Sequence, residues 1–247
     1  MSDNVQHILD VTGGDARERN RFAAAARGTV HWEGSKIEIP LSLEQLVPRP
    51  KWMTDPYSIR CHVVFHEVGK DLDERTRQEL EWEGIATAGM KTGDELRAHW
   101  RTADPRAESR ASAYHARLKR CGPFGPRSWC EKNWGTEGFS PFEDGDEWVF
   151  SWTERAGPKR LRYIFNTRWS PATRWLVKVS KQFPRLTFTM RWEELDGDNT
   201  GLLEIRRGRV VTDICCEMWG DEEDPDRYVG YVTGIEEFPF RSTPSKR

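Results

Sequence analysis

An α+β fold, with helices on one face of an antiparallel sheet, is predicted by the order of the periodic segments in this 247-residue sequence. Segments in which apolar residues alternate, the pattern of half-buried strands, occur at the N-terminus and repeatedly after residue 147. Helical patterns follow the first strand and the later hairpin. The resulting order of strand, helix, strand, strand, helix and strand is that of a ferredoxin-like plait. We expect a single domain over residues 1–247, with a mostly helical insertion at 51–128 and a flexible tail at 242–247.

The first strand and helix have the clearest local signals. Apolar residues alternate from Val5 to Val11, and Gly13-Gly14 then ends the strand. Asp15 is a typical helix N-cap, so we expect a helix over residues 16–26.

The central region has weaker signals. Helices are predicted at residues 71–83, 94–100 and 105–120, and Val63, Val64 and Phe65 favour a strand over 60–67. His62 and His66 are four residues apart, which would place them on one face of a helix as metal ligands. Because we expect a strand there and no third ligand is evident, we predict no metal and no cofactor.

The C-terminal half predicts two hairpins with a helix between them. Apolar residues alternate over 148–152 and again over 161–165, and a further strand is predicted over 186–192. Ser170-Pro171 predicts the start of a helix whose apolar stripe includes Trp175 and Val179. A second hairpin is expected around Arg207-Gly208.

Three motifs in this half carry a resemblance. The segments WCEKNWGT (129–136), FNTRWSP (165–171) and FPRLTF (183–188) resemble those of the YubB ferredoxin-like domain family, and SLEQLVPRP (42–50) resembles its P-x-P segment. That family is encoded largely by phages and plasmids, so the resemblance implies a mobile-element protein. We expect the motif residues to be structural: Trp129, Cys130, Asn133, Trp134, Gly135, Thr136, Phe165, Thr167, Trp169, Pro171, Phe183 and Pro184.

The compartment is predicted by what the chain lacks. It has no secretory signal and no run of about 18 apolar residues, so we expect no membrane span. Its five cysteines lack paired C-x-x-C spacing, which suits a reducing environment. We therefore expect a protein of the host-cell cytoplasm.

Motifs of common enzymes are absent. The chain has no phosphate-binding G-x-x-x-x-G-K or G-x-G-x-x-G pattern and no G-x-S-x-G elbow. Cys130 is interpreted as a buried structural cysteine. The acidic runs at 143–147 and 221–226 are interpreted as solvated loops, although a metal-dependent nuclease would use such carboxylates. We therefore expect binding rather than catalysis.

Two binding surfaces are candidates. Residues 101–185 hold 17 basic and 9 acidic side chains, and the helix after Pro171 has basic residues at helical spacing opposite its apolar stripe. The uncovered face of a plait can also stack nucleic-acid bases on aromatic side chains, here Trp148, Phe150, Trp152, Tyr163 and Phe165, although packing beneath the insertion is favoured. The hypothetical basic ridge comprises Arg174, Lys178, Lys181, Arg185, Arg160 and Arg162.

The functional hypothesis follows from the resemblance and from the missing catalytic motifs. We expect an accessory protein of a phage or plasmid that binds a partner, such as a host defence or regulatory protein. Nucleic acid is the alternative partner for the basic ridge.

Overall fold

The computed structural model describes residues 4–32, 35–87, 89–137, 152–154, 157, 159–194, 199–220 and 228–230. The chain divides into two compact units. Unit 1 comprises Met1–Pro48 and Cys130–Arg247, and unit 2 comprises Arg49–Trp129. Within the described ranges, no helix has the length and apolarity needed to cross a membrane.

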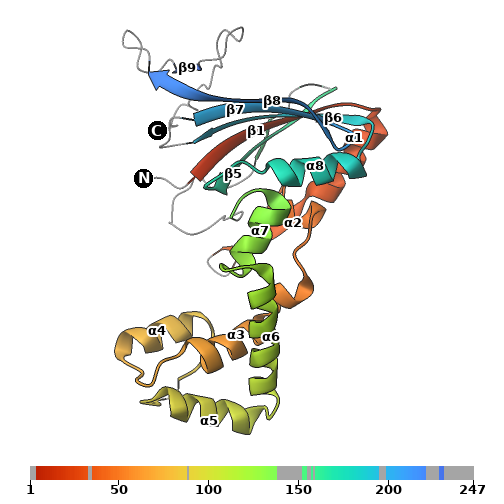
Figure 1. Cartoon of the computed structure of the whole chain (residues 1–247). Helices are drawn as coiled ribbons and strands as arrows, with labels where there is room; N and C mark the ends of the chain where they lie inside the picture. The colour runs from red at the N-terminus through yellow and green to blue at the C-terminus, as the bar shows by residue number, and fades with distance from the viewer. Residues whose placement is uncertain are drawn as a thin grey trace. The chain divides into compact units, whose positions relative to one another are not determined.

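Unit 1 contains a seven-stranded antiparallel sheet with the order β4-β5-β1-β6-β7-β8-β9 (Figure 1). β1 lies between β5 and β6, which is the strand arrangement of the ferredoxin-like fold, and β7, β8 and β9 extend the sheet beyond β6. The fold class predicted from the sequence is therefore confirmed. The strands are β1 (Asn4–Gly13), β4 (Trp152–Glu154), β5 (Leu161–Arg168), β6 (Leu186–Glu194), β7 (Asn199–Arg206), β8 (Arg209–Gly220) and β9 (Tyr228–Gly230).

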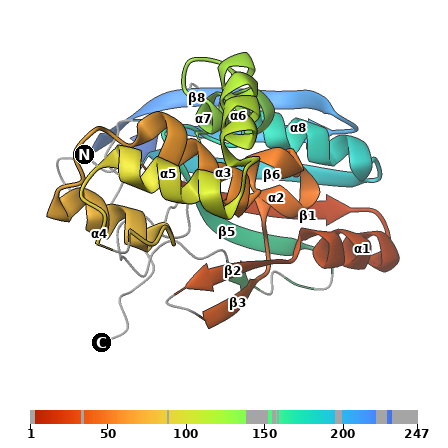
Figure 2. The same cartoon turned by 90° about the horizontal axis from the view of Figure 1, so that it is seen from below.

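Helices α1 (Ala16–Ala26) and α8 (Thr173–Gln182) cover one face of this sheet (Figures 1 and 2). α1 begins as predicted, because the Asp15 side chain accepts a hydrogen bond from the backbone N–H of Glu18. Phe22 of α1 is fully buried and makes edge-to-face contacts with Tyr163 of β5 and Phe188 of β6. These rings join the first helix to the centre of the sheet.

α8 differs from its prediction at the first turn. It begins at Thr173, two residues after Pro171, and Ser170 is not its cap. The Ser170 hydroxyl instead donates to the carbonyl oxygen of Gly135 at 2.7 Å. The predicted apolar stripe is confirmed, since Trp175 and Val179 are fully buried.

A small hairpin of β2 (Gly28–Trp32) and β3 (Ser35–Ile39) forms a separate two-stranded sheet that the sequence analysis did not predict. The short helix α2 (Leu43–Leu46) follows it. Backbone carbonyl groups of α2 accept hydrogen bonds from side chains of unit 1. The Trp175 indole N–H, for example, donates to the Leu43 carbonyl oxygen at 3.0 Å.

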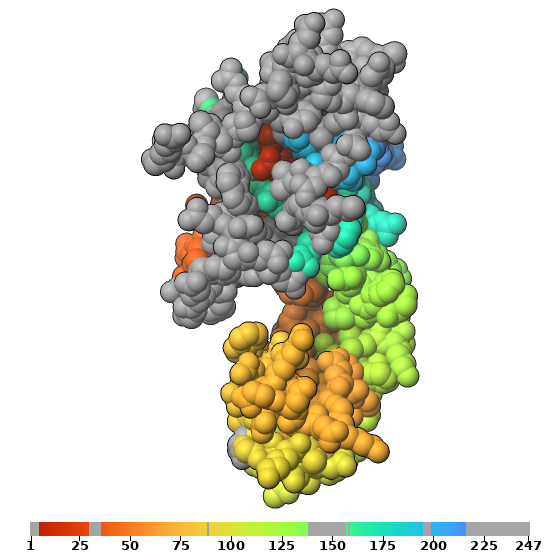
Figure 3. Space-filling model, turned by 90° about the vertical axis from the view of Figure 1, so that its left-hand side faces the viewer, coloured from red at the N-terminus to blue at the C-terminus, as the bar shows by residue number. Residues whose placement is uncertain are grey.

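Unit 2 is built from helices that enclose two apolar clusters. The larger cluster contains Val64, Leu72, Leu80, Ile85 and Leu96, and Cys61 forms a second cluster with two alanines of α6. The orange and yellow segments of this unit pack closely in the space-filling view (Figure 3). The elements are η1 (Lys51–Met53), α3 (Pro56–His62), η2 (Val63–Glu67), α4 (Glu74–Trp82), α5 (Gly93–Ala103), α6 (Ala107–Cys121) and the start of α7 (Pro126–Trp134).

The strand predicted at residues 60–67 is wrong. The segment continues α3 into η2, a single π-helical stretch. Asp55 caps α3 by accepting a hydrogen bond from the Ser58 N–H, and Pro56 occupies the first turn. Burial of Val64 against Leu80 and Leu96 outweighs the strand preference of the β-branched residues.

Candidate functional site

A basic surface lies where the end of α7 meets α8. Arg174 Nη1 donates to the carbonyl oxygen of Glu131 at 3.1 Å, and Lys178 Nζ donates to Asn133 Oδ1 at 2.5 Å. These two bonds hold the last turns of α7 against α8. We call the four cations gathered there, Lys132, Arg174, Lys178 and Lys181, the basic surface.

The four positive charges of this surface repel one another. Burial lowers the pKa of the Lys178 amine. The neighbouring positive charges of Arg174, Lys132 and Lys181 lower it further. Among the residues that the structure describes, none of the four forms an ion pair with a carboxylate. Three of them are exposed and Lys178 is half-buried, so within the described residues these positive charges have no paired carboxylate.

The structure separates the six residues of the predicted ridge. Arg174, Lys178 and Lys181 lie together on α8. Arg185 instead lies 3.6 Å from the Asp15 carboxylate, near the start of α1.

Arg160 and Arg162 contact Asp10 on the sheet face opposite the helices. The opposite orientation follows from strand alternation, because Tyr163, the next residue after Arg162, packs against Phe22 of α1.

Asp10 is the centre of a charged network on that second face. Its carboxylate accepts two hydrogen bonds from Arg162, at 2.8 and 2.9 Å, and lies 3.5 Å from Arg191 and 3.6 Å from Arg160. Asp10 is 9% exposed. Burial lowers the pKa of the Arg191 guanidinium, and the Asp10 charge partly offsets that effect. Since each of these arginines is held by Asp10, we interpret the network as structural.

One exposed aromatic side chain lies in the loop that leads into α8. Trp169, in the loop between β5 and α8, is 53% exposed and has a φ angle of 63°, a conformation that non-glycine residues rarely adopt. Hydrogen bonds on both sides hold this loop: Thr136 Oγ1 donates to the Arg168 carbonyl at 2.6 Å, and Thr167 Oγ1 donates to the Ser170 carbonyl at 2.8 Å. The loop therefore presents an indole ring in a defined place.

The loop and α8 both lie against Gly135. The Ser170 hydroxyl donates to the Gly135 carbonyl oxygen, and a Cβ atom at Gly135 would come within 3.1 Å of the backbone nitrogen of Arg174. The loop that carries Trp169 and the first turn of α8 therefore meet at the same glycine.

The remaining motif residues have structural contacts. Trp134 is buried and its indole N–H donates to the Val47 carbonyl at 2.9 Å, which joins the WCEKNWGT segment to the P-x-P segment. Cys130 is 3% exposed. Phe183 is buried against Phe22, with ring centroids 5.2 Å apart. The burial and contacts of Trp134, Cys130 and Phe183 support a structural role for these motif residues.

Two of the aromatic residues considered as a stacking platform are buried, which agrees with the favoured expectation that they pack in the core. Tyr163 and Phe165 are buried on the sheet face that α1 and α8 cover, where Phe165 contacts Trp175 at 6.2 Å between ring centroids. They pack beneath these two helices, whereas the sequence analysis expected the insertion to cover them. Trp148 and Phe150 lie outside the described residues, as do the acidic runs at 143–147 and 221–226.

Unit 2 contains a group of three histidines. His62 ends α3, His66 lies in η2, and His115 lies in α6. One ring nitrogen from each lies within 4.8 Å of the others. His66 and His115 are stacked with ring centroids 4.4 Å apart, and His62 lies 5.2 Å from each. Burial lowers the pKa of His62 to about 4, helped by repulsion from the other two rings.

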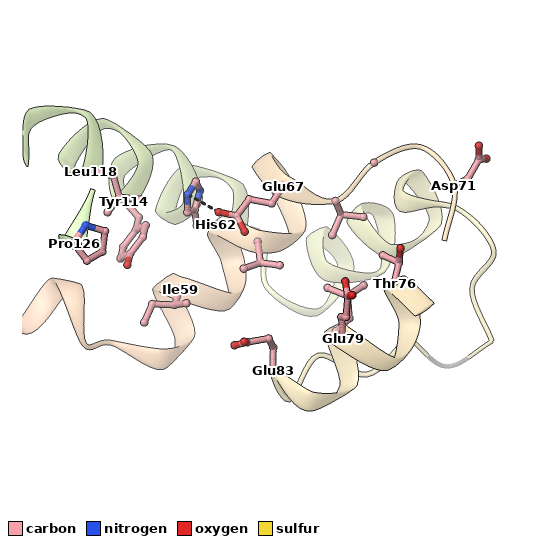
Figure 4. A pocket seen from close by; sticks show the side chains of 14 residues that line it. Ile59, His62, Glu67, Asp71, Thr76, Glu79, Glu83, Tyr114, Leu118 and Pro126 are labelled. Carbon is pink, nitrogen blue, oxygen red and sulfur yellow. Dashed lines mark ion pairs between the residues drawn. The ribbon is translucent and has the colours of Figure 1, made fainter. Parts of the chain in front are cut away.

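A cavity of about 610 Å³ adjoins this group. His62 lines it beside Glu67, whose Oε1 lies 3.4 Å from Nε2 of His62, and Tyr114 of α6 lies on the other side of the histidine (Figure 4). Glu79 of α4 and Glu83, the C-cap of that helix, also line the cavity. The wall of the cavity thus combines an imidazole, several carboxylates and apolar side chains.

Sequence reasoning missed two residues of these sites, Lys132 and His115, and assigned the segment of His62 and His66 to a strand. Lys132 was visible in the WCEKNWGT motif, but its nearness to α8 depends on how α7 packs. The helix that aligns His62 with His66 has a local signal, the Asp55-Pro56 cap, which was overlooked. His115 has no local signal, because it comes from a helix 49 positions beyond His66.

Comparison with known proteins supports the fold. Residues 147–232 match the model of a family described as a ferredoxin-like domain in Api92-like protein. The matched residues include the FNTRWSP and FPRLTF segments and exclude WCEKNWGT. The description of the matching family mentions neither the YubB family nor a phage or plasmid origin. A similar solved structure is the crystal structure of a protein Api92 from Yersinia pseudotuberculosis, with 9% identity, a TM-score of 0.43, and coverage of 87% of this chain and 98% of that chain. No curated protein matches this chain.

Proposed function

We propose that this protein acts by binding, without catalysis, and that its basic surface binds single-stranded nucleic acid. One observation carries the proposal: four cations gather at the junction of α7 and α8, none of them in an ion pair with a described carboxylate, and the loop that leads into α8 carries the exposed side chain of Trp169. Positive grooves that follow the phosphate backbone, together with aromatic rings on which bases stack, are the usual means of binding single strands.

The expected salt dependence and stacking energy are large enough to measure. Four cations can neutralise about three or four phosphates, and each neutralised phosphate contributes a slope of about −0.7 in log affinity against log salt for single strands. Stacking of one base on an aromatic ring contributes about 1–3 kcal/mol. We therefore expect an affinity that depends strongly on salt and to a smaller degree on Trp169.

The experiment is a fluorescence anisotropy titration of labelled single-stranded and double-stranded oligonucleotides at about 50 and 200 mM salt, the range over which phosphate contacts lose most affinity. The test variant is the double change Lys132→Glu and Lys181→Glu, because neither side chain donates a hydrogen bond to a described residue. The matched control is Lys36→Glu with Lys159→Glu, two exposed lysines of unit 1 outside the basic surface, which changes the net charge equally.

The expected result is tighter binding of the single strand by the native protein, weakened at least tenfold by the test variant and little by the control. Trp169→Ala should weaken single-strand binding about tenfold, whereas Trp82→Ala, which removes an indole that is 86% exposed in unit 2, should not. Equal effects of the two double variants, or no binding at either salt concentration, would overturn the proposal.

An acidic host protein is the other partner that suits the same surface. The mobile-element assignment is supported by the motif resemblance alone. A native protein that binds no oligonucleotide would direct the search to such a protein partner.

A further inference from the structure

We propose that His62, His66 and His115 form a binding site for a transition-metal ion of the zinc class. This inference concerns unit 2 and does not depend on the basic surface. It begins from the placement of three imidazoles, contributed by α3, η2 and α6, around one point.

The donor set selects the class of ion. Imidazole nitrogen suits Zn²⁺, Cu²⁺, Ni²⁺ and Fe²⁺, whereas Ca²⁺ and Mg²⁺ prefer oxygen ligands. Three protein nitrogens with one further position are a common zinc arrangement. A fourth ligand can be water.

The distances are compatible with metal binding after small side-chain movements. Nitrogens bound tetrahedrally to one zinc ion lie about 3.4 Å apart, as follows from Zn–N distances near 2.0–2.1 Å. The three histidine nitrogens lie within 4.8 Å of one another. Rotation of the exposed His66 ring and the half-buried His115 ring can close this difference without moving the helices.

The contacts of His62 suit a metal ligand whose ring is held in one orientation. Its Nε2 faces the Glu67 carboxylate at 3.4 Å. Its Nδ1 is buried and has no hydrogen-bond partner among the residues that the structure describes. A carboxylate commonly holds one nitrogen of a metal-bound histidine and leaves the other for the metal. Glu67 is therefore a positioning residue, and an ion at Nδ1 would satisfy the buried atom.

Access and charge also favour a cation. His66 is exposed, so an ion can reach the group from solvent. The carboxylates of Glu67 and Glu108 lie near enough to His66 to interact with its charge, as does the amine of Lys119. Glu108 is itself paired with Arg101 at 2.8 Å, so Glu67 is the carboxylate that favours a cation at this group.

The test is isothermal titration calorimetry of the untagged full-length protein, stripped with a chelator, using Zn²⁺ alone as the probe. We expect one equivalent of Zn²⁺ to bind. His66→Ala and His115→Ala should each weaken binding more than tenfold, and circular dichroism should show that both remain folded. The matched control is His99→Ala, which removes an exposed histidine of α5 outside the group.

A second variant pair tests the role of Glu67. Second-sphere partners contribute about 10–100-fold in metal affinity, so Glu67→Gln should weaken Zn²⁺ binding about tenfold. Glu83→Gln, on another wall of the same cavity, should leave it unchanged.

Co²⁺ provides a readout of geometry, because four-coordinate Co²⁺ absorbs visible light far more strongly than six-coordinate Co²⁺. We expect the strong bands in the native protein and their loss in His115→Ala. Absence of Zn²⁺ binding by the native protein, or affinities of His66→Ala and His115→Ala equal to that of His99→Ala, would overturn the proposal.

Discussion

His7 is a buried histidine whose charge state depends on folding. Its Nδ1 lies 3.2 Å from the Phe165 carbonyl oxygen, its ring stacks on Phe165, and its Nε2 has no hydrogen-bond partner among the described residues. Burial lowers its pKa from 6.5 to about 3. Between these pH values the unfolded chain binds a proton that the folded chain does not.

This pKa difference predicts a loss of stability in acid. The contribution of neutral His7 is fully present above pH 6.5 and falls by about 1.4 kcal/mol for each pH unit below it, down to the folded-state pKa. Urea unfolding followed by tryptophan fluorescence at pH 7.5 and 5.5 measures the effect. His7→Phe should lose about 1 kcal/mol less than the native protein over that interval, whereas His99→Ala should behave like the native protein. Equal losses in all three proteins would contradict the prediction.

Asp10 stabilises three guanidinium groups, and its replacement should show this. Asp10→Asn keeps the size of the side chain but leaves Arg160, Arg162 and Arg191 without their shared counter-charge. We expect a loss of about 2–4 kcal/mol in the free energy of unfolding, because the change removes the carboxylate that three guanidinium groups share and that accepts two hydrogen bonds from Arg162. Urea unfolding at neutral pH measures it.

Glu204→Gln is the control for this experiment. It makes the same chemical change in the same sheet, in an ion pair with Arg206, whose side chain is 58% exposed. Surface ion pairs contribute about 0–1 kcal/mol. A loss for Asp10→Asn no larger than that of the control would show that the network does not stabilise the fold.

At the scale of elements, the packing of β6 on β7 depends on a glycine. A Cβ atom at Gly201 would lie 2.6 Å from the Ile214 carbonyl oxygen and closer still to the indole ring of Trp192. Gly201→Ala should therefore lower the free energy of unfolding by about 2–3 kcal/mol through overpacking. Val211→Ala, at a side chain of the same sheet that is 56% exposed, should change it by less than about 1 kcal/mol. A neutral Gly201→Ala would mean that Trp192 can move aside.

How far the sequence predicted each element depends on whether its signals are local. α1 has an N-cap and an apolar face within its own residues, and it was predicted with the correct bounds. Residues 60–67 have strand-forming side chains, but contacts with α4 and α5 make them helical. The β-strand preference was therefore overridden by packing that no local pattern reveals.

The candidate sites could likewise be predicted only where their signals are local. The basic residues of α8 were predicted from helical spacing, because they lie on one element. Their separation from Arg160 and Arg162 depends on which sheet face each strand residue occupies, and the addition of Lys132 depends on α7. His115 joins His62 only through the packing of α3 on α6.

At the scale of the whole molecule, each unit has apolar clusters made from its own residues. The rings around Phe22 all belong to unit 1. The cluster around Leu80 contains only residues of unit 2, and so does the cluster around Cys61. We propose that unit 2 is the helical insertion expected at residues 51–128, carried by the ferredoxin-like fold without sharing its core.

Because the apolar clusters of unit 2 contain only its own residues, we expect residues 49–129 to fold alone. This fragment contains both clusters of unit 2, and helical units of this size can bury enough apolar surface to be stable. We expect a helical circular dichroism spectrum and a cooperative thermal transition. Leu80→Asp should abolish that transition, because the Leu80 side chain is 4% exposed, whereas Trp82→Asp, two residues along α4 and 86% exposed, should leave it near its original temperature. A disordered fragment, or equal effects of the two variants, would show that unit 2 needs unit 1 to fold.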